Sequence, residues 1–138
     1  MIFVDAGAFI ARFRQSDDHH VAAVHGWAEL ARSSQRLYTT NLVLMESAKL
    51  LAEIRGYRWA AARAASWLDS KELRVLRSGG EEEIEATQVM EKFADQRIGL
   101  VDCVSITLMR RHGIKRAFAF DRHFRLAGFE LWPGEARK

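Results

Sequence analysis

The chain contains very little cysteine or proline and no long apolar run. Cys103 is the only cysteine in 138 residues, so no disulfide can form within the chain and nothing suggests an oxidising compartment. With one proline and 49% apolar residues, disorder is excluded. No apolar run approaches the roughly 18 residues of a membrane span, and the apolar start lacks the basic leader of a signal peptide. We expect one cytoplasmic domain, residues 1–138, without a membrane partner.

The charge balance is only weakly basic. Lysine and arginine number 21 against 18 acids, a net charge of +3, but arginine outnumbers lysine sixteen to five. Guanidinium groups suit two-pronged contacts with phosphate better than ammonium groups do. The excess becomes informative if some acids gather in one site, because the remaining surface is then more positive than the total suggests.

Short apolar strands alternate with helical segments along the chain. Parallel neighbours need crossover helices, so this order predicts an α/β fold, a single domain with a mainly parallel five-stranded sheet flanked by helices. In the second segment, Val21, Val24, Ala28 and Ala31 share the spacing of a core-facing stripe. The expected strands are 2–4, 36–39, 73–76, 116–120 and 130–132, the last at an edge, and the main helices are 20–32, 42–54, 57–68, 81–94 and 100–112.

Two of the predicted strands are followed by aspartate. Asp5 comes after the run 2–4, and Asp121 comes after 116–120. Ligands of open α/β sheets bind beyond the carboxyl ends of the strands, which makes both carboxylates candidates for a functional cleft. The structural alternative for each is to cap the helix that follows.

Two further acids lie in apolar surroundings. Glu46 interrupts the apolar run 42–45 of a predicted helix, and a buried carboxylate there needs a metal ion, a cation or a proton beside it. A border position with a solvated head is the alternative. Asp102 lies near the start of the largely apolar helix 100–112, where it could simply complement the helix dipole.

All four carboxylates can lie on one side of the sheet. Such a cluster repels itself at neutral pH unless a divalent cation neutralises it, and oxygen ligands favour Mg²⁺ or Mn²⁺. The matching reaction is metal-assisted hydrolysis of a phosphodiester. Without these four acids, 21 basic residues face 14 acidic ones, an excess of +7 that suits a polyanionic substrate. The predicted catalytic metal ligands are Asp5, Glu46, Asp102 and Asp121.

The order and spacing of four stretches resemble those of the PIN-domain ribonucleases. Within that family the chain is similar to the small VapC-type toxins of bacterial toxin–antitoxin pairs. The resemblance covers essentially the whole chain. The matching stretches are 4–10, 39–46, 100–102 and 120–124.

The resemblance implies a Mg²⁺-dependent endoribonuclease that leaves 3′-hydroxyl and 5′-phosphate ends on its RNA substrate. It also implies a homodimer and a cognate antitoxin that covers the acidic cleft, with the four acids named above as the family's metal-binding quartet. Relatives often carry hydroxyl residues where this chain has Ala6, Gly7 and Ala119, and Thr40 or Ser105 could substitute for them. Asp95 occupies a place where relatives often have an accessory aspartate.

Two other functions stay open. The same fold could bind RNA or protein without cutting it. A phosphatase of the haloacid dehalogenase type also begins with a strand ending in aspartate, but it needs a second aspartate where Gly7 stands.

Several other residues are expected to have structural roles. His123 follows Asp121 closely and could approach phosphate, although a surface role is favoured. Cys103 is expected to pack in the core. Trp59 and Trp67 are eight residues apart and so lie on one face of the predicted helix 57–68. Core packing is the expected role of this face, and a surface for a partner is the alternative. The remaining group expected to be solvent-exposed is His19, His20 and His25.

Overall fold

Five parallel strands form the centre of the computed structural model, which describes residues 1–134. The strand order is β3-β2-β1-β4-β5, with β1 in the middle. The predicted domain end at residue 138 lies outside the described residues. The strands are β1 (Ile2–Val4), β2 (Leu37–Thr40), β3 (Leu73–Leu76), β4 (Arg116–Phe118) and β5 (Glu130–Trp132). The helices are α1 (Ala6–Phe13), α2 (His20–Ala31), α3 (Asn41–Arg55), α4 (Tyr57–Asp69), α5 (Gly80–Lys92), the 3₁₀ helix η1 (Ala94–Gln96), α6 (Leu100–His112) and α7 (His123–Leu126).

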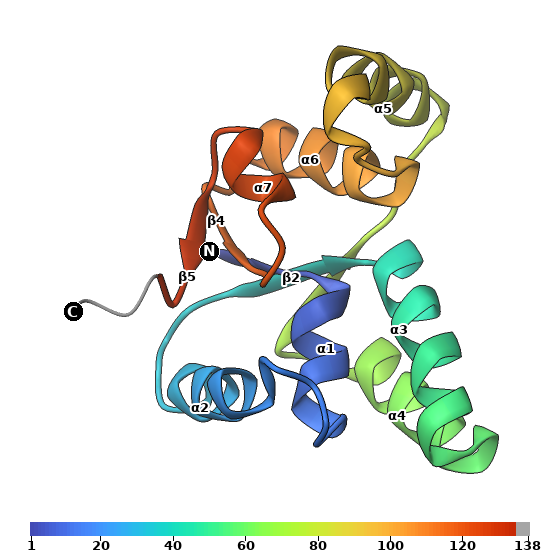
Figure 1. Cartoon of the computed structure of the whole chain (residues 1–138), viewed down its shortest axis with the longest axis vertical. Helices are drawn as coiled ribbons and strands as arrows, with labels where there is room; N and C mark the ends of the chain where they lie inside the picture. Colours follow the sequence, from blue (N-terminus) through green and yellow to red (C-terminus); the bar gives the residue numbers. More distant parts are fainter. Residues whose placement is uncertain (135–138) are drawn as a thin grey trace.

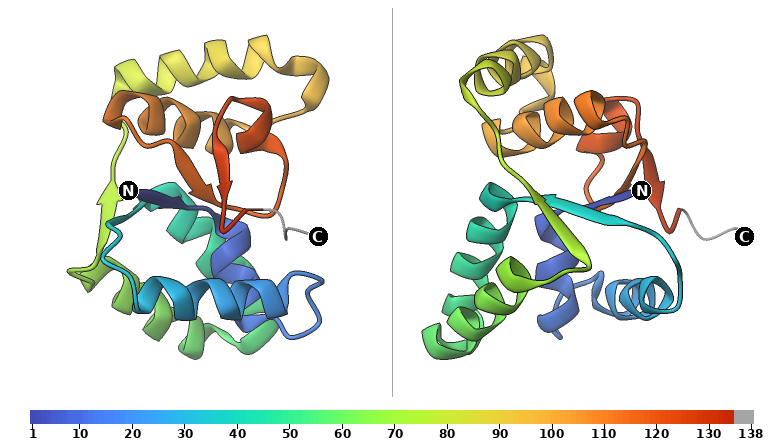
Figure 2. Two further views of the ribbon diagram at one scale, coloured as in Figure 1. Left: turned by 90° about the vertical axis from the view of Figure 1, so that its left-hand side faces the viewer. Right: turned by 180° about the vertical axis from the view of Figure 1, so that it is seen from behind.

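Helices cover both faces of the sheet. In Figure 1 the helices α1 to α4 lie below the strands, while α5, α6 and α7 lie above them. The two other views in Figure 2 show the same three layers. The chain steps outward from β1 to β2 and β3 and then crosses back to place β4 beside β1. The topological switch point, where open α/β sheets bind ligands, therefore lies between β1 and β4.

The central strand is buried on both faces. Ile2, Phe3 and Val4 have no exposed surface, and Phe118 of the neighbouring strand is equally buried. A strand covered by helices on both sides must be apolar throughout, which explains the continuous apolar run at 2–4. The carboxyl ends of β1 and β4 are therefore held by strands buried in the core.

Most predicted elements are confirmed, including several of their ends. The hydroxyl of Thr40 accepts the backbone N–H of Val43 at 3.0 Å and so caps α3. Gly113 ends α6 in the left-handed region at φ 68°, where glycine has no steric penalty. The strand predicted at 116–120 is shorter than expected: β4 stops at Phe118, and 119–122 form a loop.

The predicted apolar face of α2 is wrong. Val21 is 67% exposed and Val24 is 41% exposed, whereas the buried face consists of Ala23, Gly26 and Leu30. The reason is the space available beneath the helix. A Cβ on Gly26 would lie 2.7 Å from Cζ of Phe118, so only a residue without a side chain lets α2 approach the sheet this closely.

Two other predicted core positions are confirmed. Trp67 is buried and packs against Phe9 with ring centroids 4.9 Å apart. Cys103 is fully buried, and its thiol points to the carbonyl of Ile98 at 3.8 Å. Within residues 1–134, no helix combines the length and apolarity needed to cross a membrane.

Candidate active site

The four predicted carboxylates come from four different elements around the switch point. Asp5 follows β1 directly, and Asp121 lies in the loop that follows β4. Asp102 is in the first turn of α6, and Glu46 is in the second turn of α3, which starts directly after β2. The charges of the other three all act on the carboxyl of Asp5, so the fold brings the four groups into one electrostatic neighbourhood.

Asp5 occupies the N-cap position of α1 but does not cap the helix. Its side chain makes no capping hydrogen bond, and the residue is only 4% exposed. Oδ1 is buried without any hydrogen-bond partner among the described residues. A carboxylate oxygen in that situation carries a large desolvation cost unless something absent from the polypeptide satisfies it. The helix-cap alternative therefore does not account for this side chain.

Burial and mutual repulsion raise the pKa of three of the four acids. Burial is the largest cause of the raised pKa of Asp5, followed by the charges of Asp102 and Asp121, while the backbone amide of Ala6 acts the other way. Burial also raises the pKa of Asp102, and so to a smaller extent does the charge of Asp121. Glu46 is exposed, as the border alternative expects, and partial desolvation and the charge of Asp102 raise the pKa of its carboxyl. The folded protein thus holds negative charge in a place where its own atoms do not balance it.

His123 is the site residue whose role sequence reasoning missed. Its Nδ1 donates to Oδ2 of Asp102 at 2.8 Å and lies 3.7 Å from Oδ1 of Asp121. This hydrogen bond lowers the pKa of Asp102 and so partly opposes the effect of burial. The prediction of a surface residue is correct only in that the ring is 27% exposed. A turn of the type Asp-x-His after a strand was the signal that could have placed the ring here.

Asp121 combines a capping contact with a place in the cluster. Its Oδ1 accepts the backbone N–H of His123 at 2.9 Å, at the start of the short helix α7. The alternative that Asp121 caps the following helix is therefore correct for Oδ1 alone. Because a backbone donor fixes that oxygen, the carboxyl group keeps a defined position beside Asp102.

Asn41 adds a second unpartnered oxygen. It follows β2, next to the cap residue Thr40, and its buried Oδ1 has no hydrogen-bond partner among residues 1–134. A residue at the carboxyl end of a central strand lies at the same edge of the sheet as Asp5. Asn41 was part of a matching sequence stretch, but its type alone did not single it out.

Thr40 and Ser105, whose hydroxyls could substitute for those expected near the site, make other hydrogen bonds. Thr40 caps α3, and the hydroxyl of Ser105 donates to the carbonyl of Val101 at 3.2 Å within α6. Ala6 and Ala119, where relatives often have hydroxyl residues, are both buried. Asp95 lies exposed on η1, and it is not among the groups that shift the pKa of Asp5 or Asp102.

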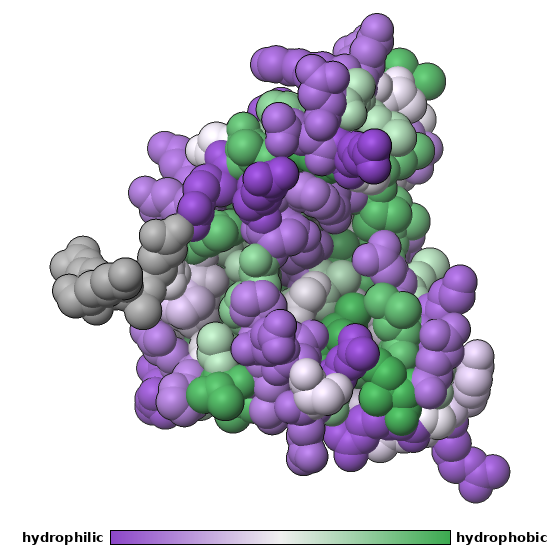
Figure 3. Space-filling model, viewed as in Figure 1, coloured by the Kyte–Doolittle hydropathy of each residue, from purple (hydrophilic) through white to green (hydrophobic). Residues whose placement is uncertain are grey.

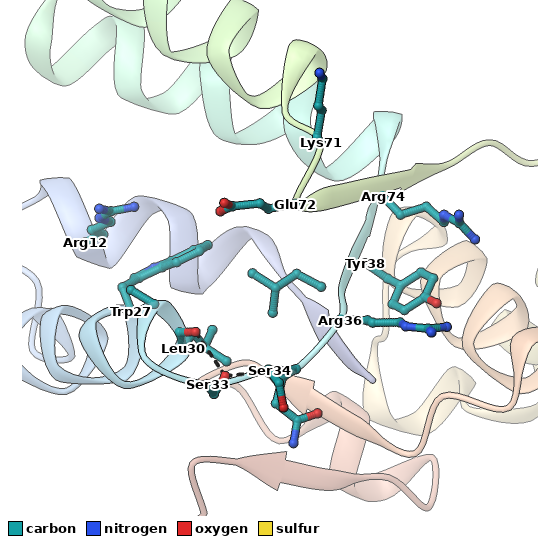
Figure 4. A pocket seen from close by; sticks show the side chains of 13 residues that line it. Arg12, Trp27, Leu30, Ser33, Ser34, Arg36, Tyr38, Lys71, Glu72 and Arg74 are labelled. Carbon is teal, nitrogen blue, oxygen red and sulfur yellow. Dashed lines mark hydrogen bonds between the residues drawn. The ribbon is translucent and has the colours of Figure 1, made fainter.

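A surface hollow lies away from the acids. It has a volume of about 780 Å³ and lies before the starts of β2 and β3, at the amino ends of the strands. Figure 4 shows Arg12 and Trp27 on one side of it, with Arg36, Tyr38 and Arg74 on the other side. The carboxylates follow the opposite ends of the strands, so this hollow is not part of the acidic cluster.

The donor set suits a hard divalent cation. Ligand atoms of Asp102, Asp121 and His123 lie within 4.8 Å of one another, and the charge of Asp5 couples to the first two. Clustered carboxylate oxygens are the ligands that Mg²⁺ and Mn²⁺ prefer. The unbonded Oδ1 of Asp5 is the observation that makes the fit specific, because a cation supplies the partner that it lacks.

Comparison with known proteins agrees with the fold described above. The PIN domain family model matches residues 2–130. The 23S rRNA-specific endonuclease VapC20 of Mycobacterium tuberculosis, in two strains, is 35% identical over 94% of this chain and 95% of its own length. The crystal structure of VapC20 from the same organism, described as a sarcin–ricin-loop-cleaving toxin, matches with a TM-score of 0.84 and 32% identity. That match covers 94% of this chain and 96% of the other. These matches displace the haloacid dehalogenase alternative, and the chain belongs to the PIN-domain family of ribonucleases.

Proposed function

We propose that this protein is the toxin of a toxin–antitoxin pair and hydrolyses a phosphodiester bond in a structured loop of ribosomal RNA. Its relative VapC20 is named as specific for 23S rRNA, and the two chains match over nearly their whole lengths. A divalent cation, Mg²⁺ or Mn²⁺, is the proposed cofactor. The proposed ligands and catalytic residues are Asp5, Glu46, Asp102 and Asp121.

The buried, unpartnered oxygen of Asp5 carries this proposal. A binding module that kept its acids for stability would pair them with donors, because an unpaired buried carboxylate destabilises the fold. Here the charges of the surrounding acids add repulsion to the cost of burial and raise the pKa of Asp5 further. An arrangement that costs stability and gathers acidic ligands is typical of a catalytic site.

The residues around Asp5 have distinct roles in this scheme. When bound, a divalent cation activates a water molecule for attack on phosphorus and offsets the charge that builds on the phosphate oxygens. His123 orients the carboxylate of Asp102 through its Nδ1, and the backbone of α7 orients Asp121. Both acids are thus held in place before substrate arrives, as electrostatic preorganisation requires.

The charge distribution supports a nucleic acid substrate. With the four acids committed to a cation, the rest of the chain carries 21 basic and 14 acidic residues, an excess of +7. Phosphate contacts from arginine and lysine supply most of the affinity of such proteins for RNA, and they make binding sensitive to salt. A ribosomal target also places the proposed activity in the cytoplasm.

A homodimer is the proposed assembly. Exposed apolar side chains on α3 support it, with Met45 59% exposed, Leu50 40% and Ile54 44%. Figure 3 shows hydrophobic side chains gathered over this part of the molecule. Apolar patches of this kind mark protein contacts more often than free surface. Size-exclusion chromatography with light scattering, with Ile54→Lys as the variant expected to give monomers, tests the assembly.

A cognate antitoxin is the second proposed partner. The acidic cleft offers a neutralising protein cation, such as an arginine side chain, the same charge complement that it offers a metal ion. We expect the antitoxin to cover that cleft and to stop cleavage when it binds. Adding the product of the neighbouring small reading frame to the cleavage assay tests this expectation.

A cleavage assay tests the enzymatic proposal directly. Purified protein is incubated with a hairpin carrying the sarcin–ricin loop sequence and with a pool of structured RNAs, in Mg²⁺ and in EDTA. The variants are Asp5→Asn and Asp102→Asn, and the matched control is Asp69→Asn, an exposed acid at the end of α4 before the amino end of β3. We expect cleavage by the wild type and the control in Mg²⁺ only.

Two outcomes contradict the proposal in different ways. Cleavage that survives EDTA or both active-site variants contradicts the metal-carboxylate mechanism. Binding of RNA with no cleavage of any substrate in Mg²⁺ or Mn²⁺ favours the non-catalytic binding module instead.

A further inference from the structure

His19 and Phe120 form a stacked pair of rings, and Phe120 is the chain neighbour of Asp121 in the acidic cluster. Their centroids are 4.6 Å apart, and the ring planes differ by 5°. Phe120 comes from the loop after β4 and is the residue directly before Asp121. His19 comes from the turn that leads into α2. Two segments distant in sequence thus build one flat aromatic platform next to a proposed metal ligand.

The inner ring of this platform is fixed to the core. Phe120 packs edge-on against Phe118, whose ring is fully buried, with centroids 5.7 Å apart. It also lies 3.9 Å from the position that a Cβ on Gly7 would occupy, in the first turn of α1 after Asp5. The inner ring is therefore held between the core and the helix that begins at the site.

The outer ring is exposed. The turn that carries His19 is fixed by Oδ1 of Asp17, which accepts the backbone N–H of His19 at 2.8 Å. Because one face of the His19 ring covers Phe120, its other face is left for solvent. An imidazole held parallel to the half-buried ring of Phe120 presents a preformed stacking surface at no further cost in side-chain order.

We propose that the outer face of His19 stacks on a nucleobase of the RNA substrate, next to the phosphate that is cut. This inference rests on the proposed function and adds a base-binding position to it. Proteins that recognise single-stranded RNA splay bases out of the strand and stack them on aromatic side chains, histidine included. Since Phe120 adjoins Asp121, a base on this platform belongs to a nucleotide close to the scissile bond.

The binding test uses the RNA hairpin that the wild type cleaves, starting with the sarcin–ricin loop sequence. All proteins carry Asp102→Asn so that the RNA stays intact. 2-Aminopurine replaces each loop base in turn, because its fluorescence is quenched when it stacks. The variants are His19→Ala and His19→Phe, and the control is His25→Ala, an exposed histidine on α2.

We expect one loop position to be quenched by the parent protein. His19→Ala should remove that quenching and weaken binding roughly ten- to hundred-fold, the range found when stacking side chains are truncated. His19→Phe should keep both the quenching and the binding affinity, and the His25→Ala control should match the parent. In proteins with Asp102 intact, His19→Ala should raise KM more than it lowers kcat, because stacking binds substrate and transition state alike.

The inference and the proposed function fail in different ways. If the wild type cleaves the RNA but His19→Ala binds and quenches like the parent, the base platform is wrong and the nuclease stands. Loss of binding in His19→Phe as well as His19→Ala also overturns the platform, because an aromatic face should suffice. If the wild type cleaves no RNA, the proposed function fails, and the inference that rests on it fails too.

Discussion

Nδ1 of His123 lies 2.8 Å from Oδ2 of Asp102, although the two residues come from α6 and the start of α7. Such a partner fixes the orientation of a ligand side chain and is worth about 10- to 100-fold in metal affinity or activity. We therefore predict that His123→Ala raises the Mg²⁺ or Mn²⁺ concentration needed for half-maximal cleavage by about that factor. Mn²⁺ binding followed by calorimetry gives a second readout that does not depend on cleavage.

The control for this variant is His112→Ala, an exposed histidine at the far end of α6. Its metal requirement should equal that of the wild type. Equal requirements in His123→Ala and the wild type would show that the contact does not support the site.

Asp5→Asn should stabilise the metal-free protein while it abolishes cleavage. The substitution keeps the shape of the side chain but removes a buried charge that the other acids repel. Stabilising changes at strained functional sites are typically worth about 0.5–2 kcal/mol. Thermal unfolding in EDTA measures the gain, with Asp69→Asn as the control. A lower melting temperature for Asp5→Asn would mean that the carboxylate stabilises the apo fold.

The metal-free protein should lose stability as pH rises from about 4 towards neutral. The pKa values of Asp5, Asp102 and Glu46 are raised in the fold, so the folded chain keeps protons that the unfolded chain has released. Their contribution is fully present below the unfolded-state pKa values and is lost as pH rises through the folded-state values. Melting temperatures in EDTA across this range, compared between the wild type and Asp5→Asn, isolate the share of Asp5.

Metal ion reverses this trend. Carboxylates bind metal in their ionised form, so the stabilisation by Mg²⁺ or Mn²⁺ should grow as pH rises. A pH-independent melting temperature in EDTA, or metal stabilisation that is greatest in acid, contradicts the charge distribution described here.

Gly26→Ala should destabilise the protein. Alanine improves helix propensity by about 1 kcal/mol relative to glycine, but a new Cβ would lie 2.7 Å from Cζ of the buried Phe118. Overpacking of this kind costs about 1–3 kcal/mol, so the clash outweighs the gain. Denaturant unfolding measures the difference. Gly80→Ala is the control, because nothing lies within 4 Å of its Cβ position, and it should be neutral or stabilising.

Local sequence patterns predicted the elements where one signal dominated. The helices predicted at 42–54 and 100–112 are observed at Asn41–Arg55 and Leu100–His112, and the residues that mark their ends, Thr40 and Gly113, act through chemistry within a single turn. The face of α2 could not be read in this way. Its valines and its small residues both recur at helical spacing, and what decides between them is the ring of Phe118 on a distant strand.

The candidate site shows the same division. Asp5 and Asp121 were predictable, because the residue after a parallel strand lies at the functional edge whatever the rest of the fold does. The ring of His123 was not, because its partner is on another helix and its direction depends on the loop after β4. Likewise, no spacing rule relates His19 to Phe120, since their stacking arises only when two loops meet.

The place of β4 next to β1 has a consequence for when the protein can act. The acidic cluster needs Asp5 from the first strand and Asp121 from the loop after the fourth, and these strands pair directly. All the helices from α1 to α6 are built between them along the chain. On the proposed assignment of the catalytic residues, a chain in which β1 and β4 have not paired lacks a complete centre, and we expect nuclease activity only after this long-range closure of the sheet.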